Sequence, residues 1–237
     1  MDSNEALQIL NGLLLGDGCL APTDFSAYYS MSLSDKSGKI MIEDFLKYLE
    51  YIGTAFDILN ISRTDGDPKV LYGKYDDGSE RRKCKLSTTT HSLLKILYDK
   101  WYKLNDNHKE IPKDFKLTPT SLAYFYMGDG NLNVVKRVYR TRIGVYHTAS
   151  LAMNGFRVQS VEIIENQLVH LGINTYRGNC SNHLKYGDDI RLYIQAESLN
   201  KFKDIIRTYI REPYLYKLSG IKQVETFADK LARLKQL

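Results

Sequence analysis

The feature that most constrains this sequence is a short apolar segment that occurs twice and ends both times in Gly-Asp-Gly. Residues 10–18 and 122–130 carry it, so that its two aspartates lie 112 positions apart (129 − 17). The same spacing separates two further similar segments, at 59–61 and 171–173. Similar segments at one fixed spacing predict a tandem duplication, in which each half is a structural unit.

Both halves predict the same order of elements. In the first half, helical spacing of apolar residues predicts helices at 4–15, 39–59 and 91–102, and strand-like runs lie at 28–33, 70–75 and 84–89. In the second half, helices are expected at 121–127, 158–171 and 199–210, with hairpins over 134–147 and 174–194. We therefore expect an α+β fold of two pseudo-symmetric αββαββα repeats, with the helices packed on one face of an antiparallel sheet in each half. The expected units are a first repeat at 1–104, a linker at 105–117 and a second repeat at 118–237.

The first helix of each half is apolar on nearly all sides, which predicts that the two helices pack against each other. Gly12 and Ala123 are small enough to allow their backbones to approach closely. Asp17 and Asp129 would then emerge side by side. Two adjacent carboxylates repel each other unless cations lie between them, and oxygen ligands of this kind suit Mg²⁺. A single Gly-Asp-Gly is more simply a helix C-terminal turn, but its duplication at matched positions favours a site for metal-assisted phosphodiester hydrolysis.

The charges are divided unevenly between the halves. Residues 1–117 contain 16 lysines and arginines against 18 acidic residues, whereas residues 118–237 contain 17 against 10. A basic half is typical of proteins that bind polyanions, although a merely solvated surface explains the charge alone equally well.

The sequence lacks the features of a membrane or secreted protein. No apolar run approaches the roughly 18 residues needed to span a bilayer, and the N-terminus has no basic signal-peptide region. Cys19, Cys84 and Cys180 are far apart and suggest neither a disulfide framework nor a zinc cluster. We expect an intracellular protein with no membrane partner, in a compartment that the sequence does not define.

The duplicated segments resemble the motif of the LAGLIDADG homing endonucleases, in their single-chain form with two fused repeats. The first copy matches at Leu10, Gly12, Leu13, Asp17 and Gly18, and the second at Leu122, Ala123, Asp129 and Gly130. Leu15 and Met127 replace the first acidic residue of the motif. Ile111-Pro112 and the stretch 117–124 also look like the lead-in to the second motif in these proteins.

The resemblance implies a catalytic role for the two aspartates. Asp17 and Asp129 would coordinate divalent ions together with scissile phosphates and the backbone carbonyls of Gly16 and Gly128. Mg²⁺ is the expected ion, with Mn²⁺ as an alternative and Ca²⁺ as an ion that supports binding but poor cleavage.

The resemblance also places a basic residue near each site. Lys109 and Lys217 look like those residues, with the task of stabilising charge on the phosphorus centre or orienting water. Either one alone is more simply a solvated surface lysine, and the repeat makes the two interpretations equally good.

The two sheets of this family form a saddle that lies along the DNA major groove. By this resemblance the expected DNA-binding residues are Tyr72, Lys74, Arg81, Arg82, Lys83, Lys85, Lys136, Arg137, Arg140, Arg142, Arg177, Lys185 and Arg191. Each one taken alone could equally be a solvated strand residue. Without the strand register, base contacts cannot be separated from phosphate contacts.

The function expected from these observations is site-specific endonuclease action on double-stranded DNA. The resemblance implies a monomer with pseudo-twofold symmetry that makes a staggered cut with 3′ overhangs in a long asymmetric target. The alternative is an RNA-splicing maturase that binds host intron RNA, or a non-cleaving DNA-binding protein, on the same fold. The retention of both aspartates and both lysines favours an active enzyme, and an intron-encoded origin fits better than an intein.

Overall fold

The structure is a computed structural model that describes residues 1–34, 40–64, 68–75, 78, 80–102, 108–139, 142–179 and 190–219. For residues 135–139, 142–144 and 179 the description covers the backbone only. Within these residues, no helix is long and apolar enough to cross a membrane.

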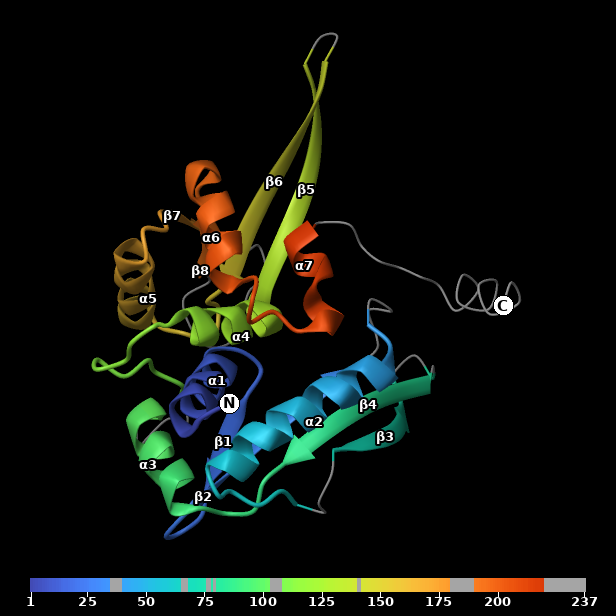
Figure 1. Cartoon of the computed structure of the whole chain (residues 1–237), viewed down its shortest axis with the longest axis vertical. Coiled ribbons are helices and arrows are strands. Elements are labelled where there is room, and N and C mark those ends of the chain that lie inside the picture. The colour runs from blue at the N-terminus through green and yellow to red at the C-terminus, as the bar shows by residue number, and fades with distance from the viewer. Residues whose placement is uncertain are drawn as a thin grey trace.

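The first half builds one four-stranded antiparallel sheet of order β1-β2-β4-β3. Its elements are α1 (Ser3–Leu15), β1 (Cys19–Pro22), β2 (Ala27–Ser34), α2 (Ile42–Ile58), β3 (Lys69–Lys74), β4 (Glu80–Ser87) and α3 (Ser92–Trp101). Along β2, Ala27, Tyr29, Met31 and Leu33 are buried and alternate with more exposed residues. This period of two means that only one face of the sheet is covered by helices, as Figure 1 shows for α2.

The second half repeats the plan with a sheet of order β5-β6-β8-β7. Its elements are α4 (Pro119–Asp129), β5 (Gly130–Tyr139), β6 (Arg142–Ala152), α5 (Val158–His170), β7 (Thr175–Asn179), β8 (Ile190–Ile194), α6 (Leu199–Ile206) and α7 (Tyr216–Ser219), with 3-10 turns at Ala196–Ser198 and Glu212–Tyr214. The β5–β6 hairpin projects far beyond the rest of the molecule (Figure 1). The α+β fold with two similar repeats, expected from the sequence, is confirmed.

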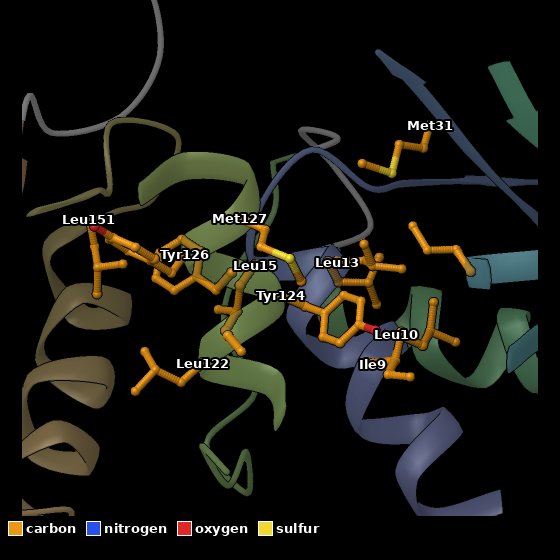
Figure 2. Close-up of a cluster of buried hydrophobic side chains, with 14 of the residues drawn as sticks. Ile9, Leu10, Leu13, Leu15, Met31, Leu122, Tyr124, Tyr126, Met127 and Leu151 are labelled. Atoms are coloured by element: carbon orange, nitrogen blue, oxygen red, sulfur yellow. The ribbon is translucent and has the colours of Figure 1, made fainter. Parts of the chain in front are cut away.

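The centre of the molecule is the packing of α1 against α4. A methyl group added at Gly12 would lie 2.5 Å from the carbonyl oxygen of Ser121 and 2.6 Å from Cβ of Tyr124, so only glycine permits this approach. Figure 2 shows Leu15 and Met127 among the side chains gathered around the two helices. Both are almost fully buried. Their burial explains why apolar residues stand where the family motif has an acidic one, since an unpaired buried carboxylate would be costly.

The start of α4 is fixed by a capping box. Thr118 Oγ1 accepts a hydrogen bond from the backbone N–H of Ser121 at 3.2 Å, and Ser121 Oγ accepts one from the N–H of Thr118 at 2.9 Å. Pro119 occupies the first turn. This cap fixes the start of α4, and the helix carries Asp129 at its far end.

Candidate active site at the ends of the paired helices

The two Gly-Asp-Gly turns meet on the pseudo-twofold axis. A Cβ built on Gly16 would lie 3.6 Å from Cα of Gly128, and the reciprocal distance is 3.5 Å. The same construction places Oδ2 of Asp17 3.2 Å from the Gly128 position and Oδ2 of Asp129 3.8 Å from the Gly16 position. Each carboxylate therefore lies close to the glycine of the other helix, and the two acids share one small region.

Both aspartates have a raised pKa, mainly because burial disfavours the charged form. The pKa of Asp129 rises to about 6, with the nearby negative charge of Asp17 as a further cause. The pKa of Asp17 is also raised by burial, and the two lysines oppose that rise. A cation bound beside them would favour the charged form of both carboxylates.

The ammonium group of each lysine donates hydrogen bonds to several backbone carbonyl oxygens at the end of a helix. Lys109 Nζ donates to the carbonyl oxygens of Leu14, Gly16 and Gly18 at 2.8, 3.1 and 2.9 Å. Lys217 Nζ does the same one repeat later, with the carbonyl oxygens of Tyr126, Met127, Gly128 and Gly130 at 3.2, 2.6, 3.1 and 2.7 Å. The alternative interpretation from the sequence, that these are freely solvated surface lysines, therefore does not hold.

The charges are paired across the two halves. Among the positive charges that lower the pKa of Asp17, Lys217 has the larger effect, whereas Lys109 has the larger effect on Asp129. Burial lowers the pKa of Lys109, and Asp129 is the main group that opposes this. Each aspartate is therefore influenced most strongly by the lysine of the other half.

A pocket of about 300 Å³ opens beside one of these pairs. Its lining includes Asp129, Lys109 and Gly16, together with Leu15, Ala152, Asn154, Gly155 and Phe156. The pocket thus brings a carboxylate and an ammonium group to one concave surface.

The donor set fits Mg²⁺ only when other ligands complete it. Within the described residues, no group of three or more histidines, cysteines, aspartates or glutamates could hold a metal ion. Two carboxylates with neighbouring carbonyl oxygens are hard oxygen ligands, and Mg²⁺ commonly takes one or two carboxylates and fills its shell with water and substrate phosphate. The predicted carbonyl ligands of Gly16 and Gly128 already accept hydrogen bonds from Lys109 and Lys217, so only one lone pair of each remains for a metal.

The register of the first sheet divides the predicted DNA-binding residues between its two faces. Cys84 and Leu86 of β4 are buried under the helices, so the alternating residues Arg81, Lys83 and Lys85 belong to the open face. Arg82 has the helix-side register and is half-buried.

The β3 strand follows the same division. Tyr72 pairs with Arg82 and Lys74 pairs with Glu80, so both residues have the helix-side register. Tyr72, Lys74 and Arg82 are therefore outside the open face that was expected to contact DNA, because a single-residue step along a strand reverses the side-chain direction.

In the second sheet, Arg191 and Arg177 differ in the same way. Arg191 is next to the buried Leu192 and lies on the open face, where its charge lowers the pKa of Asp129. Arg177 pairs directly with Leu192 and so has the helix-side register. Its Nε donates to the two carboxylate oxygens of Glu165 on α5 at 2.9 and 3.0 Å, which gives it a partner within the protein.

The remaining predicted residues are less fully described. Lys136, Arg137 and Arg142 lie in the β5–β6 hairpin, where their backbones pair with Val145, Gly144 and Tyr139. Arg140 and Lys185 lie outside the described residues. Sequence reasoning also missed Lys69, which pairs with Lys85 on the open face and lines a pocket with it.

Comparisons with known proteins agree with this architecture. A model of the LAGLIDADG DNA endonuclease family matches residues 7–202. The chain is 24% identical over 225 residues to the uncharacterized protein MJ1098 of Methanocaldococcus jannaschii, with 91% of this chain and 74% of that protein covered.

Solved structures share the fold at lower identity. The homing endonuclease I-WcaI bound to its DNA recognition sequence has a TM-score of 0.69 at 22% identity, with 90% of this chain and 85% of that chain covered. The meganuclease I-SmaMI bound to uncleavable DNA has a TM-score of 0.55 at 12% identity, covering 94% and 91%. Since the family model spans most of the sequence and both motif copies, the chain belongs to the LAGLIDADG DNA endonuclease family.

Proposed function

We propose that this protein is a site-specific endonuclease that hydrolyses both strands of a DNA duplex at one long asymmetric target. The observation that carries the proposal is the pair of aspartates on the pseudo-twofold axis, each accompanied by a lysine from the other half. Two equivalent reaction centres related by a twofold axis match the symmetry of two antiparallel DNA strands.

The chain's own residues would divide the work between charge and position. Asp17 and Asp129 would hold divalent ions against the scissile phosphates, with Mg²⁺ preferred, Mn²⁺ as a substitute and Ca²⁺ allowing binding with little cleavage. Such ions polarise a phosphate and provide a hydroxide nucleophile. Lys109 and Lys217 keep a positive charge at the end of each helix, where it lies close enough to act on both carboxylates and on added phosphate charge.

The open faces of the two sheets would receive the duplex. Arg81, Lys83, Lys85 and Arg191 contribute positive charge there, which attracts the phosphate backbone. The two sheets differ in sequence, so each is expected to read a different half-site. We further propose that one chain binds as a monomer and leaves 3′ overhangs, as in the single-chain enzymes it resembles.

The test is selection of a randomised duplex library on the purified protein in Ca²⁺, followed by addition of Mg²⁺ and sequencing of the released ends. Recovery of one long site cut on both strands, with cutting absent in Asp17→Asn, supports the proposal. Enrichment of a site that Mg²⁺ never cleaves contradicts it. That outcome would point to a DNA-binding protein, or to a maturase if intron RNA then binds in competition with the duplex.

A further inference from the structure

The segment that carries Lys217 is fastened to the other half of the molecule. Lys217 lies in α7, the last described element, and its neighbour Tyr214 is buried. The Tyr214 ring contacts two aromatic rings of α2, with centroids 4.9 Å from Tyr48 and 6.4 Å from Phe45. The Lys217 ammonium group lies 5.5 Å from the Tyr214 ring centroid. The packing of Tyr214 on α2 therefore supports the position of the lysine.

Arg211 is the polar counterpart of that aromatic contact. Its guanidinium carbon lies 3.7 Å from the ring centroid of Tyr51 on α2, and its Nη2 donates to the Tyr51 hydroxyl. Its Nε donates to the hydroxyl of Tyr124 on α4 at 3.0 Å. Its backbone N–H contacts Sδ of Met127 at 3.3 Å. One side chain therefore joins α2 of the first half, α4 of the second and the start of the segment that ends in Lys217.

We propose that Arg211 is a positioning residue for Lys217. The residues between Arg211 and Lys217 bond mainly to one another, with the N–H of Tyr214 bonded to the carbonyl of Arg211 and that of Leu215 to Glu212. Such a compact segment transmits a shift at its first residue to its last. Arg211 helps to keep Lys217 at its carbonyl acceptors by holding the start of the segment against Tyr51 and Tyr124.

The chemistry requires arginine. The planar guanidinium stacks on one tyrosine ring while its N–H groups reach two hydroxyls in different directions. A lysine would keep the positive charge but could not make this fork. Arg211→Lys therefore separates positioning from charge, because only a positioning role predicts that the lysine variant fails.

The inference rests on the proposed nuclease function, and its first test uses that activity. The substrate is the selected duplex with a different label on each strand, cleaved in a single turnover at saturating protein. Lys217→Ala identifies the strand that depends on Lys217. Arg211→Ala and Arg211→Lys should slow cutting of that same strand by about tenfold or more, with the other strand changed less than about twofold, so that nicked product accumulates.

Two further variants control for folding. Tyr51→Phe removes one hydroxyl and keeps the ring, and it should slow the same strand by a smaller factor. Arg63→Ala removes another arginine that contacts α2, where it pairs with Asp57 at 3.2 Å, and it should leave both strands unchanged. Equal slowing of both strands by the Arg211 variants, or no slowing of either, would overturn the proposal.

A second readout does not depend on cleavage. Reductive methylation with formaldehyde and cyanoborohydride modifies accessible amines, and mass spectrometry follows each lysine separately. Lys217 should be methylated several-fold faster in Arg211→Ala than in the unmodified sequence, while Lys109 serves as the internal control and does not change. If the protein cleaves no DNA, the endonuclease proposal fails alone and this measurement decides the positioning role. An unchanged Lys217 rate refutes it.

Discussion

Lys109 and Lys217 make nearly the same contacts but are supported differently. Lys109 forms a β-bridge with Tyr102, and the following Ile111 N–H donates to Ser160 Oγ on α5 at 3.0 Å. Lys217 instead depends on side chains, chiefly Arg211 and the buried Tyr214. In both cases part of the support comes from a helix of the other half, α5 for Lys109 and α2 for Lys217. The contacts of the two lysines are thus similar in both halves, whereas the residues that support the lysines differ.

The sheets differ more than the centre. The β1–β2 hairpin contains four paired positions, whereas the β5–β6 hairpin contains ten. Lys85 of β4 faces Lys69, while Arg191 of β8 faces Gly178 across the corresponding strand pair. A duplex bound by both sheets would thus meet two unlike surfaces, which suits an asymmetric target.

The largest expected effect tests whether the two centres are equivalent. Asp17→Asn and Asp129→Asn should each reduce double-strand cleavage by about a thousandfold or more, because a neutral amide binds a divalent ion far more weakly than a carboxylate does. Single-turnover cleavage in Mg²⁺ and binding in Ca²⁺ measure the two properties separately, and binding should change less than about threefold. Asp99→Asn on α3 is the matched control. Full double-strand cutting by either active-site variant would show that its half is not required.

The second prediction concerns the helix pair, where the halves are not equivalent. Gly12→Ala should lower the free energy of unfolding by roughly 1 to 3 kcal/mol, because the new methyl group meets the backbone of Ser121. Gly73→Ala, with nothing within 4 Å of the added methyl group, should have little effect. Urea unfolding measures both. Similar values for the two variants would contradict the close approach of α1 and α4.

The third prediction uses the difference between the aspartates. The folded pKa of Asp129, about 6, exceeds its ordinary value of 3.8, so the folded chain binds this proton more tightly than the unfolded chain. The associated stability is fully present below about pH 4 and is lost as the pH rises through about 6. Without metal, Asp129→Asn should therefore become more stable than the unmodified protein between pH 4 and 7, by roughly 1 to 2 kcal/mol after solvent screening.

Thermal unfolding in chelator at several pH values checks this. The more exposed Asp17 should show a smaller gain in Asp17→Asn. A gain that does not depend on pH would assign the effect to packing rather than to ionisation.

The smallest expected effect tests the two faces of the first sheet. Lys85→Ala should weaken DNA binding about three- to tenfold and reduce the slope of log affinity against log salt by about one, since one phosphate contact is lost. Lys74→Ala should leave both quantities unchanged within about twofold. Titrations at several salt concentrations provide the measurement. Equal effects would show that the duplex also contacts the helix side of β3.

The sequence predicted the parts of this molecule that occur in both halves, because each copy of a repeated segment supports the interpretation of the other. The duplicated Gly-Asp-Gly located both aspartates, and the shared spacing located most helices and strands. The four-residue strand β1 was missed because it is too short for a periodic pattern. The sequence did not show on which face of their sheets Tyr72, Lys74, Arg82 and Arg177 lie, because charge and strand tendency do not fix register. The role of Arg211 was also missed, since its partners are 160 and 87 positions away.

The contact between Gly12 and Tyr124 affects whether either half of the chain could pair with a copy of itself. These residues occupy equivalent places in the two motifs, 112 positions apart (124 − 12), and they meet on the axis. If two copies of the first half paired with each other, a glycine would face a glycine at this position and leave a gap between the helices. Two copies of the second half would set tyrosine against tyrosine and collide. The mismatch makes each half prefer the other over itself, so engineering either one into a self-pairing protein must begin by resizing this residue.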